Sequence, residues 1–192
     1  MKIVCLIPVR LNSKRIKNKN FIKIKNLTLL ELVCKKIVKS KYISNFYIAS
    51  EKSNKVQNLV EKNKKINYFA RSKKSSTHIA KTEIVIKEFI KKIDCDLVVL
   101  VQVTNPFVSY KYLDEAIIKL KRKNYDTLLS VVKSKDFLWQ FSSPTTPLNY
   151  NYRNRKMSQK LKGHLIENGS FYIFYKSKFL KHNNRLHGKI GR

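Results

Sequence analysis

The chain has 192 residues and a mass of 22.7 kDa, with 42 basic against 12 acidic side chains and a formal net charge of +30. Hydrophobic residues make up 43% of it, which excludes an intrinsically disordered chain and predicts a folded core. Apolar runs such as Leu97 to Val101 are far shorter than the roughly 20 residues that a bilayer span needs, so we expect no association with a membrane.

Predicted strands and helices alternate along the first half of the chain. Residues 2–9 are apolar without alternation, which is typical of a strand buried on both faces. A polar loop follows at 10–20, and Thr28 is expected to cap a helix that ends near Lys39. The other elements expected in this half are strands at 45–50 and 66–70 and helices at 53–63 and 79–93.

The same alternation continues in the second half, with one interruption. The run 97–103 is the strongest buried strand of the prediction, and a turn at 104–106 leads into a helix at about 110–123. A further strand is expected at 127–133, whereas the region from about 137 to 163 lacks periodicity and is interpreted as an excursion from the sheet. A strand at 169–175 and a short helix at 177–181 complete the prediction.

This order of elements predicts one α/β domain over residues 1–192, built on a mostly parallel, doubly wound sheet with helices on both faces. In open sheets of this kind, ligands bind beyond the carboxyl ends of the strands. That rule selects the loops after Val9, Ser50, Val103 and Lys133 as the places where a site is expected.

The three cysteines, Cys5, Cys34 and Cys95, lie far apart, and each is embedded in an apolar run. This pattern is typical of reduced thiols that act as small hydrophobic residues, and it favours neither a metal site nor a disulfide framework. The first apolar stretch is broken by Pro8 and Arg10, which is too early for a signal peptide. We therefore expect a cytoplasmic protein.

The loop after the first predicted strand is rich in hydrogen-bond donors. Guanidinium, ammonium, hydroxyl and amide groups gather there, and a triphosphate needs such donors because charge-assisted bonds neutralise its oxygens. The glycine-rich Walker pattern is absent from the loop, so a Walker-type phosphate site is not expected. On composition alone, the loop could equally be a generic basic loop. The donors are Arg10, Ser13, Lys14, Arg15, Lys17, Lys19 and Asn20.

The charge of the whole chain has two interpretations. Of the basic residues, 34 are Lys and 8 are Arg, and they are spread along the sequence. Lysines that cover solvated faces explain such a distribution, and a surface for nucleic acid or another polyanion is the second interpretation. None of the common nucleic-acid-binding patterns occurs in the sequence, so nucleic acid is the less favoured partner.

Three stretches resemble one family. Residues 7–20 read Ile-Pro-Val-Arg-Leu-Asn-Ser-Lys-Arg-Ile-Lys-Asn-Lys-Asn, residues 101–106 read Val-Gln-Val-Thr-Asn-Pro, and residues 167–172 read Glu-Asn-Gly-Ser-Phe-Tyr. In this order and spacing they are similar to the motifs of the acylneuraminate cytidylyltransferases, the CMP-sialic acid synthetases. The resemblance covers essentially the whole chain.

The resemblance implies a Rossmann-like nucleotidyltransferase fold and a reaction between CTP and a nonulosonic, sialic-type acid that yields the CMP-sugar and pyrophosphate. In the family, Mg²⁺ sits against the phosphates, so positioning and charge stabilisation carry most of the catalysis. The excursion at about 137–163 corresponds to an arm with which members of the family commonly form a homodimer.

Site residues are implied by position. Arg10 and Lys19 match catalytic residues, and Gln102, Gln159 and Tyr172 match residues on the sugar side. The residues that match the nucleotide side are Arg10, Ser13, Lys14, Lys19, Asn20, Arg71, Ala80 and Thr82.

Some of these residues also have simpler interpretations. Gln102 can be a turn former at the end of a buried strand, Thr82 can be a hydroxyl at the start of a helix, and Tyr172 can be a core aromatic. Ser158 stands where the family carries an arginine, and a hydroxyl cannot replace the fork of a guanidinium. His78 stands where the family usually has an aspartate.

The expected metal ligands are missing from the sequence. Members of the family continue past the segment 188–191 into a strand and an Asp-x-Asp motif that holds Mg²⁺, whereas this sequence ends at Arg192. Asp94 and Asp96 precede the strand at 97, at the end opposite the expected ligand edge, so they are interpreted as a solvated turn. We therefore expect no metal ligands among these residues and a truncated or degenerate member of the family. The alternative is a pseudoenzyme that keeps nucleotide binding or pairs with an intact paralogue.

Overall fold

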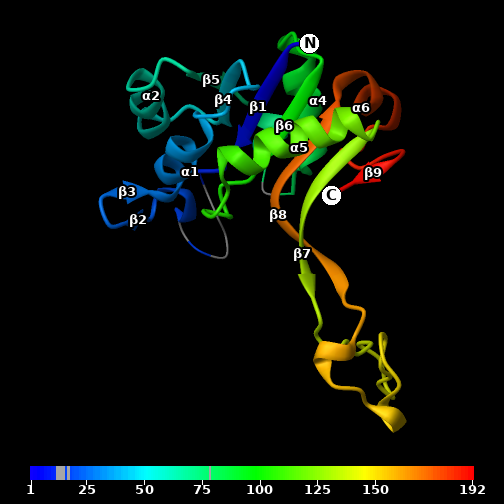
Figure 1. Cartoon of the computed structure of the whole chain (residues 1–192). Coiled ribbons are helices and arrows are strands. Elements are labelled where there is room, and N and C mark those ends of the chain that lie inside the picture. The colour runs from blue at the N-terminus through cyan, green and yellow to red at the C-terminus, as the bar shows by residue number, and fades with distance from the viewer. Residues whose placement is uncertain (12–15, 17, 78) are drawn as a thin grey trace. The chain divides into compact units, whose positions relative to one another are not determined.

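The computed structural model describes residues 1–11, 16, 18–77 and 79–192. Within these residues, one sheet has the strand order β5-β4-β1-β6-β8-β7-β9 (Figure 1). β1 pairs in parallel with β4 and β6, β4 pairs in parallel with β5, and β8 runs antiparallel to β6. The predicted mostly parallel α/β sheet is therefore confirmed. Its strands are β1 (Ile3–Pro8), β4 (Asn45–Ser50), β5 (Ile66–Ala70), β6 (Leu97–Val101), β7 (Thr127–Ser134), β8 (His164–Tyr175) and β9 (Ile190–Gly191).

Helices cover the sheet on both faces, as a doubly wound arrangement requires. Cys5 and Ile7 of β1 belong to one apolar cluster together with α1, α2 and α5, whereas Val4 and Leu6 belong to a second cluster with α4 and α6. Successive side chains of a strand point to opposite faces, so an unbroken apolar run is what a strand between two helical layers needs. The helices are α1 (Leu29–Ile37), α2 (Asn54–Glu61), α3 (Lys73–Ser76), α4 (Thr82–Lys92), α5 (Tyr110–Arg122) and α6 (Lys176–His182).

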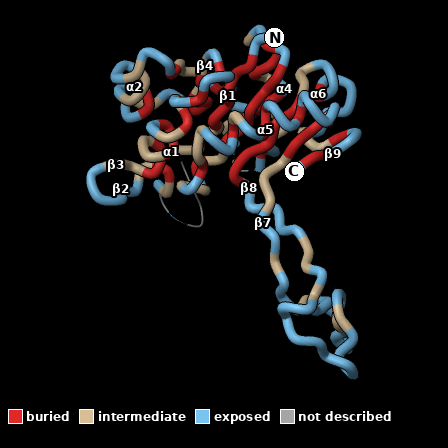
Figure 2. Tube along the Cα trace, viewed as in Figure 1, coloured by how far each residue is buried: buried red, intermediate tan, exposed pale blue. Residues whose placement is uncertain are grey.

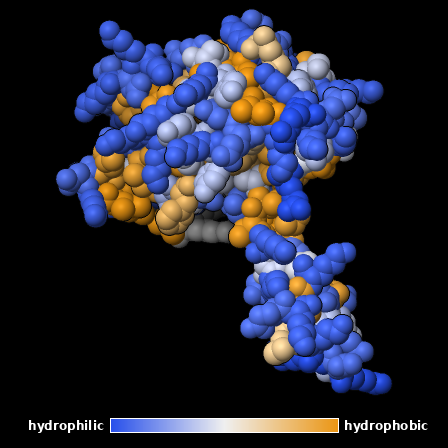
Figure 3. Space-filling model, in the orientation of Figure 1, coloured by the Kyte–Doolittle hydropathy of each residue, from blue (hydrophilic) through white to orange (hydrophobic). Residues whose placement is uncertain are grey.

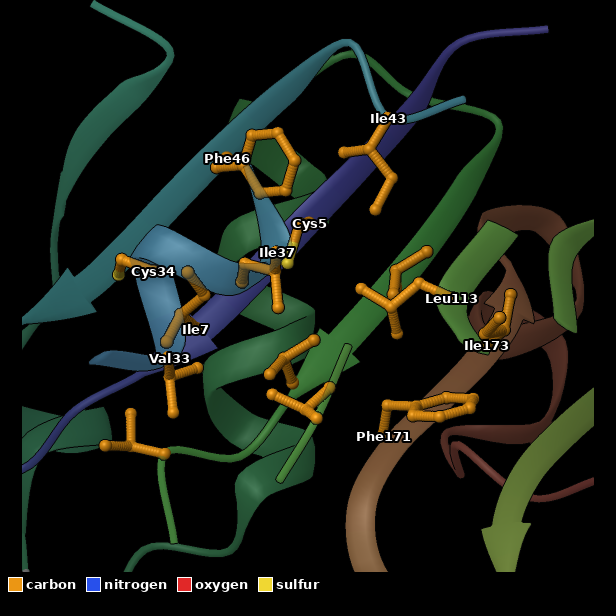
Figure 4. Close-up of a cluster of buried hydrophobic side chains, with 14 of the residues drawn as sticks. Cys5, Ile7, Val33, Cys34, Ile37, Ile43, Phe46, Leu113, Phe171 and Ile173 are labelled. Atoms are coloured by element: carbon orange, nitrogen blue, oxygen red, sulfur yellow. The ribbon is translucent and has the colours of Figure 1, made fainter. Parts of the chain in front are cut away.

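The first of these clusters is centred on β1 and α1. Figure 4 shows Val33, Cys34 and Ile37 of α1 beside Cys5 and Ile7 of β1. Figure 2 shows buried residues in red along the central strands. All five residues of β6 are buried, in agreement with its continuous apolar sequence.

α1 begins where the sequence places its cap. The Thr28 hydroxyl oxygen accepts a hydrogen bond from the backbone N–H of Glu31 at 3.2 Å, and the Glu31 carboxylate accepts from the backbone N–H of Thr28 at 2.7 Å. This reciprocal capping box pairs two N–H groups that the first turn of a helix otherwise leaves unpaired. The helix that precedes β4 is therefore fixed at its amino end.

Several boundaries differ from the prediction. β6 ends at Val101, two residues before the predicted end, and α4 begins at Thr82 rather than at residue 79. The four-residue helix α3 and the hairpin β2 (Lys23–Ile24) to β3 (Leu27–Thr28) were not predicted. These elements are too short for hydrophobic periodicity to reveal them.

Two compact units are distinguishable along the chain. One contains residues 1–130 and 169–192 and holds most of the sheet; the other contains residues 131–168. In the second unit, the side-chain amide of Asn149 donates to the backbone carbonyl of Asp136 at 2.8 Å and accepts from the backbone N–H of Leu138 at 2.9 Å. The Arg155 guanidinium stacks on the ring of Phe137, with 4.1 Å between Cζ and the ring centroid. A local polar and aromatic network thus holds this unit together.

In the view of Figure 3, hydrophilic side chains cover most of the visible face of the unit that carries the sheet. None of the helices in the described ranges combines the length and the hydrophobicity that are needed to cross a bilayer.

Candidate functional site

Strand order in the sheet reverses at β1. The chain passes from β1 through α1 to β4 on one side, and it later returns to place β6 on the other side of β1. In open α/β sheets, ligands bind beyond the carboxyl ends of the strands that flank such a reversal. The residues that follow β1, β4, β5 and β6 are therefore the candidates for a site.

Arg10 occupies the centre of this edge. It follows Val9, whose backbone N–H donates to the Ala49 carbonyl at 2.8 Å and so extends the pairing of β1 with β4. The buried Asn20 donates through Nδ2 to the backbone carbonyl of Arg10 at 3.1 Å, and Nη2 of Arg10 donates to the backbone carbonyl of Ala80. Three segments that are distant in the sequence therefore meet at one arginine.

Arg71 follows β5 and is almost entirely buried, with 7% of its surface exposed. Its Nη1 donates to the Val9 carbonyl at 3.2 Å, and its Nη2 donates to the Ser75 carbonyl. Burial lowers the pKa of the Arg71 guanidinium from its ordinary value; the nearby Glu51 carboxylate opposes this shift, and the charge of Arg10 adds to it. The two guanidinium groups are therefore neighbours at the strand ends.

Ala80 and Thr82 lie where the chain turns into α4. Ala80 is buried, its backbone N–H donates to the Thr77 carbonyl at 3.2 Å, and its own carbonyl accepts from Arg10. Thr82 is the first residue of α4 and follows the N-cap residue, Lys81.

Gln102 follows β6 and faces the start of the buried half of β8. Its backbone N–H donates to the Ser170 carbonyl at 3.0 Å. Gly169 has a φ of +64°, and a Cβ atom built on it would lie 3.1 Å from Oε1 of Gln102. A glycine at this position thus leaves room for the side chain of Gln102.

The other residues assigned by resemblance belong to different elements of the chain. Tyr172 lies in the core, 2% exposed, with the Arg185 guanidinium 4.6 Å from its ring centroid. Gln159 belongs to the unit of residues 131–168, where its carbonyl accepts from Nζ of Lys135. Lys19 is half-buried at the start of a short 3₁₀ helix, Lys19–Phe21. Ser13 and Lys14 lie outside the described residues.

The resemblance also implies Mg²⁺, a hard cation that prefers carboxylate oxygens. Glu51 directly follows β4 and accepts from the backbone N–H of Leu11 at 3.3 Å. In the described ranges, no three His, Cys, Asp or Glu side chains come together in a way that could hold a metal ion. These residues therefore do not fit a complete Mg²⁺ site.

Carboxylates of this chain serve largely as acceptors for the backbone. Asp94 and Asp96 are exposed and directly precede β6, at the predicted end of that strand, although the segment is not a regular turn. Oδ2 of Asp96 accepts from the Lys2 backbone N–H at 2.6 Å, and Asp94 pairs with the Lys2 ammonium at 3.3 Å. Within the described part of the chain, the carboxylates that accept a hydrogen bond from a backbone N–H include Glu31, Glu51, Glu88, Asp96, Asp114 and Asp126.

Sequence reasoning missed two features of this edge. The first is the use of backbone carbonyls, those of Val9, Ser75 and Ala80, as acceptors for the two arginines. No side-chain pattern encodes a carbonyl. The second is Gly169, although its place in the Glu-Asn-Gly stretch was a signal that the backbone there needs a left-handed conformation.

The chain matches the family model described as "Cytidylyltransferase" over residues 4–187. It is 28% identical over 177 residues to N-acylneuraminate cytidylyltransferase A of Danio rerio, a match that covers 89% of this chain and 41% of that relative. The chain thus spans less than half of the length of this curated relative. Both matches confirm the resemblance that the sequence motifs indicated.

Solved structures share the fold at low sequence identity. The 4-diphosphocytidyl-2C-methyl-D-erythritol synthase of Anaerococcus prevotii has a TM-score of 0.70 and 16% identity, over 95% of this chain and 73% of that one. A CMP:2-keto-3-deoxy-manno-octonic acid synthetase complexed with CTP also has a TM-score of 0.70, with 13% identity over 98% of this chain and 80% of that one. These likenesses confirm the predicted Rossmann-like fold.

Proposed function

Because this chain belongs to the cytidylyltransferase family, we propose that it activates a nonulosonic, sialic-type acid with CTP, giving the CMP-sugar and pyrophosphate. The observation that carries the proposal is the meeting of Arg10, Asn20, Arg71 and Ala80 at the edge of the sheet where strand order reverses. The name of the relative from Danio rerio supports the sialic-type substrate.

The reaction forms one bond and breaks one. The anomeric hydroxyl oxygen of the sugar acid attacks the α-phosphorus of CTP, the bond from that phosphorus to the bridging oxygen of the β-phosphate breaks, and the hydroxyl proton leaves to solvent. Negative charge on the phosphates increases toward the leaving pyrophosphate. Positive side chains that are fixed before the reaction stabilise such charge without reorganising.

Arg10 is the residue best supported for that task. It directly follows the end of β1 and Val9, its backbone carbonyl is fixed by Asn20, and its guanidinium already lies beside Ala80, just before α4. A guanidinium suits phosphate oxygens because its N–H groups form a planar fork. Lys19, one residue before Asn20, supplies a second, half-buried cation in the proposed site.

The nucleotide is proposed to lie over Arg10, Asn20, Ala80 and Thr82, together with Ser13 and Lys14. The sugar acid is proposed to lie on the side of Gln102, which is the half-buried polar side chain after β6. Gln159 and Tyr172 remain predictions from the resemblance, and the buried ring of Tyr172 supports an indirect role through the wall of the site.

Release of pyrophosphate tests this proposal. CTP, Mg²⁺ and N-acetylneuraminate, or another nonulosonic acid, should release pyrophosphate in proportion to the amount of protein, and Arg10→Ala should reduce release and CTP affinity by at least about tenfold. The matched control is Lys119→Ala, which removes one exposed charge from the last turn of α5. Saturating substrates without release, for the chain with all its native segments, would contradict the enzymatic proposal. CTP binding without release would favour the pseudoenzyme.

The unit of residues 131–168 is proposed to form the interface of a homodimer. Large hydrophobic side chains are exposed on it, and exposed apolar surface of this kind is typical of contact sites. Sedimentation equilibrium should give a dimer for the wild type and a monomer for Phe141→Ser with Leu148→Ser. Tyr112→Ser on α5 is the control. The exposed large hydrophobic residues of this unit are Val132, Trp139, Phe141, Leu148, Tyr152, Met157, Leu165 and Ile166.

A further inference from the structure

Arg71 connects the ends of three elements. Its own backbone N–H donates to the Ser50 carbonyl at 3.0 Å, at the end of β4. Its Nη1 reaches the Val9 carbonyl, directly before Arg10, and its Nη2 reaches the Ser75 carbonyl in α3. One residue therefore ties the ends of β1 and β4 to Ser75 in α3.

Both terminal nitrogens of the Arg71 guanidinium donate hydrogen bonds to the protein itself. With 7% of the residue exposed, the group is removed from water, and a buried charge is costly unless its N–H groups find acceptors. Two carbonyls supply them, and Nε of Arg71 has no hydrogen-bond partner among the described residues. The planar guanidinium therefore bridges two backbone segments, one at Val9 and one at Ser75.

The segment 72–80, which the structure describes except for residue 78, has a second contact with Arg10. Arg71 holds its middle at Ser75, and Arg10 holds its end at Ala80. The Ser72 side chain adds a local cap by accepting from the Ser75 backbone N–H at 3.3 Å. Without the Arg71 contacts, α3 would keep the hydrogen bonds of its N-cap Ser72 to the Glu88 carboxylate but lose its tie to β1, and a single turn is not stable alone.

We propose that Arg71 is a positioning residue, whose guanidinium fixes the segment 72–80 against the end of β1 so that Arg10 and Ala80 are in place before a nucleotide binds. This inference rests on the proposed function and changes the role that the resemblance assigned to Arg71. It acts through Arg10 and Ala80 rather than by contact with the ligand. The nucleotide then binds a site whose ordering has already been completed, and that lowers the cost of binding.

Amide hydrogen exchange of the nucleotide-free protein tests this role directly. In Arg71→Met, exchange in the segment 72–80 and at residues 9–11 should become roughly tenfold faster, because hydrogen bonds from a charged donor are lost. Arg71→Lys keeps the charge but not the fork, so it should give an intermediate rate. Arg122→Met, which changes an exposed arginine in the last turn of α5, is the matched control and should leave these rates unchanged.

Calorimetric titration with CTP separates positioning from ligand contact. A positioning residue lowers the fraction of binding-competent protein, so the apparent Kd for CTP should rise in inverse proportion to the closed fraction that hydrogen exchange reports for Arg71→Met. Addition of saturating CTP should then slow the exchange of the segment in Arg71→Met toward the wild-type rate. In steady state, KM for CTP should rise while kcat stays close to the wild-type value.

Two results would overturn the inference. Unchanged exchange in 72–80 of Arg71→Met together with weaker CTP binding would make Arg71 a ligand-contacting residue. Unchanged exchange in both Arg71 variants with unchanged affinity would remove it from the site altogether. The absence of CTP binding by the wild type would instead count against the proposed function, since the exchange rates of the nucleotide-free protein report the contacts of Arg71 independently. Arg71→Lys keeps the test valid if Arg71→Met does not fold.

Discussion

Gly169 lies against the side chain of Gln102, so closely that a Cβ atom at position 169 would be 3.1 Å from Oε1 of Gln102. The glycine also has a φ of +64°, where L-residues are strained. β8 therefore turns its backbone, rather than a side chain, toward the residue that follows β6.

Gly169→Ala should destabilise the protein by about 1–2 kcal/mol, because it places an L-residue in the left-handed region. Urea denaturation measures the change. Gly169→Asn is the matched control, since asparagine tolerates this conformation better, and it should recover part of the loss. The close contact adds a second expectation: in a Gln102→Ala background, Gly169→Ala should cost less than in the wild type. If Gly169→Ala lowers the free energy of unfolding equally in both backgrounds, backbone strain explains the whole effect and the contact with Gln102 explains none of it.

The capping box of α1 should make stability depend on pH. The backbone N–H of Thr28 and then its hydroxyl, both bonded to the carboxylate, lower the pKa of Glu31 in the folded protein. A carboxyl with a lowered folded pKa contributes stability above its unfolded pKa of about 4.3, and this contribution is lost as the pH falls through the folded value. The difference in unfolding free energy between the wild type and Glu31→Gln should therefore be present at pH 7 and shrink below about pH 4.

Denaturation with urea at both pH values measures that difference. Glu115→Gln, which changes an exposed carboxylate on α5, is the control and should give a small difference at either pH. A Glu31→Gln effect that does not diminish on acidification would show that the charge of Glu31 does not act through the cap.

Arg185 should contribute measurably to stability. Its Nη1 lies 2.6 Å from Oε1 of Glu83 in the first turn of α4, both side chains are about three-quarters shielded, and the guanidinium stacks on Tyr172. Arg185→Met should lower the free energy of unfolding by about 1–2 kcal/mol through loss of the pair and of the cation–π contact. Arg185→Lys keeps the charge without the planar stack and should recover a minor part of it. A loss below about 0.5 kcal/mol, typical of surface changes, would contradict this.

The three cysteines should be unreactive in the folded protein. Burial raises the pKa of the Cys34 thiol to about 12, and burial raises those of Cys5 and Cys95 as well. Because the thiolate is the reactive form, Ellman's reagent at a mildly alkaline pH should detect almost no thiol in the native protein and all three in guanidinium chloride. Lys119→Cys provides an exposed thiol as a positive control. Rapid reaction of the native wild type would show that one of the apolar clusters opens.

The sequence predicted the sheet well because its central strands are apolar runs. The sequence predicts four of these strands, β1, β4, β5 and β6, and all four contain buried residues in the structure. The helices between them carry one apolar face each. β8 was predicted from residue 169, whereas it begins at His164, because its first residues are largely exposed. A strand that is not buried gives no apolar signal.

The candidate site was predictable only as a location. The rule that ligands bind at strand ends selected Arg10, and the resemblance selected Arg71 and Ala80. The contacts between them depend on backbone carbonyls that come together when the sheet forms, so they have no counterpart in a linear pattern. The hairpin 23–28 also has no clear signal in the sequence. Lys25, rather than glycine or asparagine, takes the positive φ in its turn.

The use of carboxylates such as Glu31, Glu51 and Asp126 as acceptors for the backbone affects how the chain responds to its solvent. Acidification neutralises these acceptors and weakens their hydrogen bonds, and at the same time it leaves 42 basic side chains without any opposing charge. Mutual repulsion of like charges opposes the compact state and is weakened by dissolved ions. We therefore expect counterions, sulfate and phosphate above all, to widen the range of pH over which this protein stays folded.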